Sequence, residues 1–117
     1  MNKLMEVAAA AALIVGGAGA ASAQDFSGAQ QIAQGDWQGA ERFIVAQQRL
    51  FPNDADLLLN LAAVYIRTGR VAEARQLYRT VATQPDEILD LSGGRTASAH
   101  ELAAAGLRRL NMVASAR

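Results

Sequence analysis

The sequence predicts an all-α domain of antiparallel helix-turn-helix repeats, about two of them, with one more helix at the C-terminal end. Three observations support this fold class. Apolar residues recur at helical spacing, a motif with glycine and alanine returns after 34 residues (from Gly35 to Gly69), and each copy is followed by a proline. Such a period is typical of stacked helix pairs, because one pair alone cannot bury its apolar face.

The composition limits the classes of protein that the chain can represent. It has 117 residues, 51% of them hydrophobic, with no cysteine, one histidine, and eleven basic residues against eleven acidic ones. Length and apolar content fit a single domain. A neutral chain is a poor partner for nucleic acid, which attracts a basic excess. The absence of cysteine and the single histidine exclude disulfides and multi-histidine or thiolate metal sites, so we expect no metal and no cofactor.

Residues 1–23 have the pattern of a secretory signal peptide. Lys3 supplies the positive start, an apolar run extends over 7–21, and Ala21-Ser22-Ala23 is the small-residue pattern that precedes cleavage. The apolar run is shorter than the ~18–20 residues that a membrane-spanning helix needs. We therefore expect export to the bacterial periplasm as a mature domain of residues 24–117 without a membrane span. The alternatives are an uncleaved anchor and an alanine-rich first helix of a cytosolic protein.

The first repeat, residues 26–52, is degenerate. Its first helix is expected over 26–34, but polar Ser27 and Gln31 stand where the repeat pattern requires apolar residues. We interpret it as a terminal cap, because end repeats carry a polar outer face. Its second helix has an apolar face, formed by Trp37, Ala40, Phe43, Ile44, Leu50 and Phe51.

Residues 55–85 form the better repeat. Asn53 or Asp54 is expected to cap its first helix, and Thr68-Gly69 to end that helix, because glycine adopts the left-handed conformation at low cost. A turn this short forces the second helix to pack antiparallel. The apolar positions of the first helix are Leu58, Leu61, Ala62 and Tyr65, and those of the second are Val71, Ala74, Leu77, Tyr78, Val81 and Ala82.

The C-terminal turn and helix occupy residues 86–117. Residues 87–92 alternate in part between polar and apolar, and Gly93-Gly94 is a strong turn signal. Ser98 and Glu101 have the spacing of a capping box at the start of the last helix. This helix does not continue the repeat pattern, and we expect it to stack on the second repeat as a cap.

The segment 55–85 resembles the tetratricopeptide repeat family. The motif residues are Leu58, Leu61-Ala62 and Tyr65 in the first helix, Ala74 and Tyr78 in the second, and the closing Pro85. The resemblance implies a non-enzymatic protein–protein interaction module that binds a peptide or a helix on its concave face. The polar and basic side chains by which some members bind an acidic chain end are missing from this face.

The resemblance also implies which residues form that face. They are Leu59, Ala63, Ile66 and Arg67 on one flank of the first helix, with Arg70 at the edge. Because this helix is apolar around most of its circumference, we expect the flank to be a partly exposed apolar strip. The alternative is that the last helix folds over the strip and covers it.

Two other functions compete with this interpretation. His100 is the only side chain that ordinarily titrates near neutral pH, and with Ser98 and Asp90 nearby in sequence it suggests a small hydrolase. The chain could also be a structural subunit of an envelope complex. The leading hypothesis is a periplasmic adaptor whose partner is a protein or peptide, with self-association as an alternative.

Overall fold

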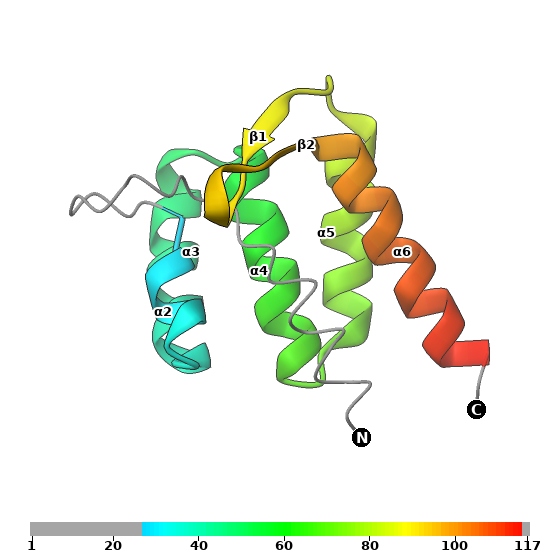
Figure 1. Ribbon diagram of the computed structural model, residues 1–117. Helices are drawn as coiled ribbons and strands as arrows, with labels where there is room; N and C mark the ends of the chain where they lie inside the picture. The colour runs from blue at the N-terminus through cyan, green and yellow to red at the C-terminus, as the bar shows by residue number, and fades with distance from the viewer. Residues whose placement is uncertain (1–26, 116–117) are drawn as a thin grey trace.

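The computed structural model describes residues 27–115 and contains five α-helices and a small sheet (Figure 1). The signal-peptide prediction for residues 1–23 lies outside the described residues. In chain order the elements are α2 (Ala29–Ala33), α3 (Trp37–Leu50), α4 (Ala55–Arg67), α5 (Val71–Thr83), β1 (Ile88–Asp90), the 3-10 turn η2 (Ser92–Gly94), β2 (Thr96–Ser98) and α6 (Ala99–Ser115). The predicted all-α class of helical repeats is confirmed, and the sheet is a minor addition to it.

The caps and turns of the helices follow from local chemistry. The Asp54 carboxylate accepts a hydrogen bond from the Asp56 N–H at 2.9 Å, so Asp54 is the predicted cap of α4. Gly69 has φ +84° directly after Thr68, the C-cap of α4, as expected for the break between α4 and α5. The helices α4 and α5 have thirteen residues each.

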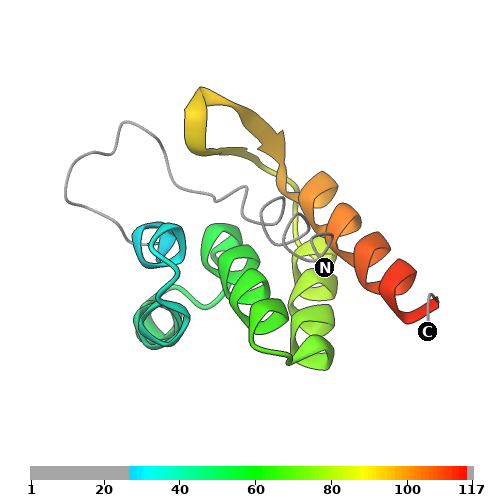
Figure 2. The same ribbon diagram turned by 60° about the horizontal axis from the view of Figure 1, so that its bottom comes forward.

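The helices lie side by side in chain order, with α4 in the middle (Figure 2). Each helix packs on the previous one, and α6 also touches α4. Two apolar clusters result, one on each side of α4. The cluster toward α2 and α3 contains Ile32, Ala40, Ile44, Leu57, Leu61 and Val64. The cluster toward α5, β1 and α6 includes Leu58, Ala62, Ala74, Tyr78, Val81, Leu89, Leu91 and Ala103.

The first repeat departs from the expected pattern at both ends. α2 has only five residues, whereas the sequence predicts a helix over 26–34. The buried Asn60 amide donates to the Ser27 carbonyl at 3.0 Å, which ties the start of α2 to α4. Leu50 and Phe51 were expected on the apolar face of α3, but they are 68% and 52% exposed. That part of the prediction is wrong, because the helix ends there beyond the reach of its neighbours.

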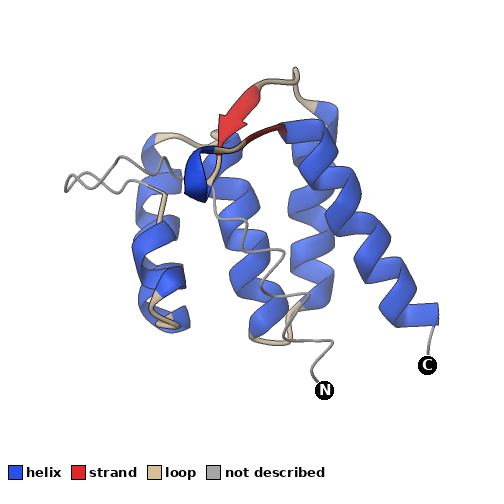
Figure 3. Cartoon of the chain, in the orientation of Figure 1, coloured by secondary structure: helices blue, strands red, loops and turns tan. Residues whose placement is uncertain are grey.

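A β-hairpin connects α5 to α6 (Figure 3). β1 and β2 pair antiparallel with Leu89 opposite Ala97, and Gly93 and Gly94 take positive φ in the turn between them. Leu89 and Leu91 are buried in the cluster with α5 and α6, which anchors the hairpin to the helices. Residues 88–90 of the alternating segment 87–92 therefore form a strand that the sequence alone did not identify.

Helix α6 stacks on α5 as the predicted C-terminal cap. Ser98 Oγ accepts from the Glu101 N–H at 3.2 Å, which is one half of the predicted capping box. Ala99, Ala103 and Leu110 are buried, and Gly106 lies directly against the Tyr78 ring. The small residues let the two helices approach closely.

Candidate functional site

The predicted partner-binding strip lies on the flank of α4, but half of it is not exposed. Leu59 and Ala63 are only 7% and 5% exposed, so the expectation of an exposed apolar strip is wrong at these two residues. Ile66 is half-buried and Arg67 is exposed. The accessible part of the strip is therefore the last turn of α4.

The C-terminal segment accounts for the burial of Leu59. Leu59 belongs to the apolar cluster that contains Leu89 and Leu91 of the hairpin and Ala103 of α6, and Ile66 packs against the same cluster. The alternative in which the last helix folds over the strip stays a prediction, because this cluster joins Leu59 to the hairpin as well as to α6. Sequence periodicity places Leu59 on a flank of α4, but it does not determine whether later segments of the chain cover that flank.

The two predicted arginines are engaged with neighbouring helices. The Arg67 guanidinium lies 4.7 Å from the centroid of the Trp37 ring at the start of α3. Arg70 pairs with Glu41 of α3 through two hydrogen bonds of 3.0 and 2.5 Å and lies 4.4 Å from the centroid of the Tyr65 ring. The hydrogen bond from Arg70 holds the pKa of Glu41 below its usual value. Arg70 thus joins the two repeats rather than standing free at the edge of a groove.

The three residues of the hydrolase interpretation do not form a catalytic site. The Nε2 of His100 lies 2.6 Å from the Gln84 carbonyl oxygen, so this nitrogen is a donor and is not free to accept a proton from serine. Ser98 Oγ donates to the Asp86 carboxylate, at 2.7 and 2.9 Å from its two oxygens, and not to His100. Among the described residues, Asp90 has no hydrogen bond or ion pair with either of them.

Asp86 forms several hydrogen bonds that hold the chain together after α5, and the sequence did not predict this role. Its carboxylate accepts hydrogen bonds from Ser98 Oγ and from the backbone N–H groups of His100 and Glu87. These bonds, that of Ser98 above all, lower the pKa of Asp86. The carboxylate holds the chain after α5 against the start of α6. No local signal predicts this role, because its main partners lie 12 and 14 residues further along the chain.

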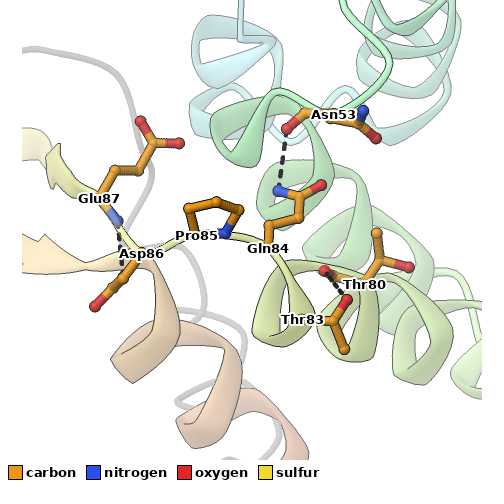
Figure 4. A pocket seen from close by; sticks show the side chains of 7 residues that line it. All are labelled: Asn53, Thr80, Thr83, Gln84, Pro85, Asp86 and Glu87. Carbon is orange, nitrogen blue, oxygen red and sulfur yellow. Dashed lines mark hydrogen bonds between the residues drawn. The ribbon is translucent and has the colours of Figure 1, made fainter.

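A polar hollow of about 580 Å³ lies where α5 ends (Figure 4). Its lining is Asn53, Thr80, Thr83, Gln84, Pro85, Asp86 and Glu87. The polar groups bond to one another: Gln84 Nε2 donates to the Asn53 carbonyl at 3.1 Å, and Thr83 Oγ1 donates to the Thr80 carbonyl at 2.8 Å. No pair of nucleophile and base faces the hollow, so its lining does not supply the parts of a hydrolytic site.

Carboxylates gather where β1 meets the start of α4. Burial above all, together with the charges of Asp54, Glu87 and Asp90, raises the pKa of Asp56 to about 6. The ionised form of Asp56 therefore lowers the stability of the folded protein at neutral pH.

Within residues 27–115, no group of three or more carboxylate or imidazole side chains has an arrangement that could hold a metal ion.

Replacing Asp56 by asparagine is expected to raise the free energy of unfolding at pH 7 by about 1 kcal/mol, once solvent screening of this partly buried group is allowed for. The folded pKa of about 6 exceeds the ordinary value of 3.8, so the folded protein binds more protons between these limits. Its stability must then fall as the pH rises from about 4 to about 6. Urea unfolding of both proteins at pH 4 and pH 7 measures the effect.

Glu73→Gln is the matched control, because both carboxylates lie in the first turn of a helix but Glu73 is exposed whereas Asp56 is half-buried. We expect the gain from Asp56→Asn to shrink at pH 4, where the native carboxyl is protonated. An equal gain at both pH values would contradict the assignment of the cost to the charge.

Comparison with known proteins gives one match. A family model described as tetratricopeptide repeat matches residues 31–91, which include α3, α4, α5 and β1. No curated protein and no solved structure matches the chain significantly. In the part of the chain that the structure describes, no helix has the length and apolar character required to cross a membrane.

Proposed function

Because the chain belongs to the tetratricopeptide repeat family, whose members typically bind other proteins, we propose that it is a non-enzymatic adaptor of the bacterial periplasm. It binds a peptide or a helix of a partner protein on the side of α4 that bears Ile66 and Arg67. The family is generally non-enzymatic, and the arrangement of His100, Ser98 and Asp86 described above is in keeping with this proposal.

The observation that carries the binding proposal is the surface at the last turn of α4. There Ile66 is half-buried and Arg67 is exposed, so an apolar side chain lies beside a cation that can orient a ligand. The neighbouring Trp37 holds the Arg67 guanidinium from one side. Leu59 and Ala63, which are buried, support this surface from below rather than meeting the partner.

The periplasmic location rests on the leader pattern of residues 1–23, and the structure adds nothing to it. A chain without cysteine needs no oxidation to fold in that compartment. The partner is accordingly expected among exported proteins or the periplasmic parts of envelope proteins.

The test is crosslinking of the native chain in intact cells, followed by release of the periplasm. We expect one partner to be captured, by a form of the chain that begins at Gln24. Arg67→Glu is expected to reduce capture by about tenfold or more, because the cation at the binding surface is reversed. The substitution also removes the contact with Trp37, which is worth about 1 kcal/mol of stability.

Arg79→Glu is the matched control, since Arg79 is an exposed arginine of α5 that faces neither apolar cluster. Equal capture by the two variants would contradict the proposed surface. A captured chain that retains Met1 in the membrane fraction would contradict the periplasmic location.

A further inference from the structure

The outer edge of β1 carries unpaired backbone groups. The Leu91 N–H donates to the Arg95 carbonyl at 2.7 Å, and the Ala99 N–H donates to the Glu87 carbonyl at 2.8 Å. With Leu89 opposite Ala97, these bonds fix which residues of β1 face β2. Since bonded residues alternate in an antiparallel pair, the N–H and C=O groups of Ile88 and Asp90 point away from β2. Nothing within residues 27–115 forms a hydrogen bond with them.

This edge is accessible and firmly held. Ile88 is 69% exposed, and Glu87 and Asp90 are exposed as well. Between them Leu89 is buried, so the strand is anchored in the core while its edge faces outward. Figure 3 shows the hairpin across the upper ends of the helices. An extended chain can therefore approach the edge without displacing a helix.

The charge around the edge selects the kind of chain that fits. Glu87 and Asp90 flank Ile88, and Asp56 lies close enough for its charge to interact with both carboxylates. The cation on the hairpin itself is Arg95, in the turn that leads into β2. An approaching segment that carries lysine or arginine is attracted to this edge, whereas an acidic segment is repelled.

We propose that β1 accepts an extended, lysine- or arginine-bearing segment of a partner protein as a third strand of the sheet. The free backbone groups of Ile88 and Asp90 supply the ladder, and Glu87 and Asp90 select basic side chains. This surface is separate from the last turn of α4, so it can bind a partner even if the proposed function there is wrong. Because only two residues offer free groups, charge supplies much of the affinity and added salt weakens it.

The experiment is a titration of the full chain with a synthetic hexapeptide of alternating lysine and valine, followed by amide hydrogen exchange. We expect exchange at Ile88 and Asp90 to slow by about tenfold or more when the peptide binds. Exchange at Leu89 and Leu91 should change little, because their amides already belong to the ladder. Protection confined to alternate residues is the signature of an added strand.

Two control peptides separate strand addition from charge alone. N-methylation of alternate peptide amides removes the donors and should abolish protection, and replacement of lysine by glutamate should abolish binding. The double variant Glu87→Gln with Asp90→Asn is expected to bind at least about fivefold more weakly, with Glu73→Gln as the control. The proposal would be overturned if the methylated peptide bound as tightly as the unmethylated one. It would also be overturned if binding gave no protection at Ile88 and Asp90, or gave protection at Ile66 and Arg67 instead.

Discussion

Replacing Gly106 by alanine is expected to lower the free energy of unfolding by about 2 kcal/mol, the usual cost of overpacking a core. α6 crosses α5 at Gly106, and a Cβ atom there would overlap the ring of Tyr78. Tyr78 is 4% exposed, so its ring has little room to move aside. The same burial raises the pKa of Tyr78 to about 12. Chemical denaturation of the two proteins measures the loss.

The sign of the change in the free energy of unfolding shows whether packing or helix propensity dominates at Gly106. Alanine in place of glycine favours a helix by about 1 kcal/mol, so propensity alone predicts a more stable protein. In the background of Tyr78→Leu, where the ring is absent, Gly106→Ala is expected to be stabilising. A gain in stability with Tyr78 in place would show that α5 and α6 do not approach as closely as the structure shows.

The second repeat could be predicted from the sequence because its information is local and periodic. Leu58, Ala62 and Tyr78 recur at the spacing of a helix face and are all buried. Asp54 and Gly69 mark the helix ends by their own backbone chemistry. The pattern that marks each of these residues extends over only a few positions, which is the range over which sequence patterns are informative.

The hairpin and the hydrogen bonds of Asp86 could not be predicted in the same way. β1 has three residues, too few for an alternation to be distinguished from an irregular loop. Asp86 acts on Ser98 and His100 only after the chain has turned back on itself. Local pattern carries no information on such contacts, so the candidate trio chosen from sequence contained Asp90 in place of Asp86.

The partner-binding strip shows the same limit. The repeat pattern places Leu59, Ala63 and Ile66 on one flank of α4, and the structure agrees that Leu59 and Ile66 belong to the same side. Which part of that flank is covered depends on where the hairpin lies. The pattern therefore gives the direction of each side chain but not its exposure.

Replacing Leu59 by glutamate is expected to lower the free energy of unfolding by about 4 kcal/mol, which combines the lost burial of leucine with the cost of burying an unpaired charge. Leu59 is 7% exposed in the cluster with Leu89 and Leu91, and among the described residues this cluster is apolar. The free energy of unfolding of a small domain is typically about 5–15 kcal/mol, so a loss of about 4 kcal/mol removes a large part of it. Thermal or urea unfolding of the purified variant measures it.

Leu50→Glu is the matched control, because it makes the same chemical change at a leucine that is 68% exposed. At that position we expect a change within about 0.5 kcal/mol, as for most surface substitutions. If Leu59→Glu were as mild as Leu50→Glu and also abolished partner capture, Leu59 would belong to an open binding strip, as its sequence position suggests. If instead only Leu59→Glu destabilises the chain while Arg67→Glu leaves it folded and impairs capture, the partner meets the last turn of α4, and the buried residues beneath serve to hold that turn in place.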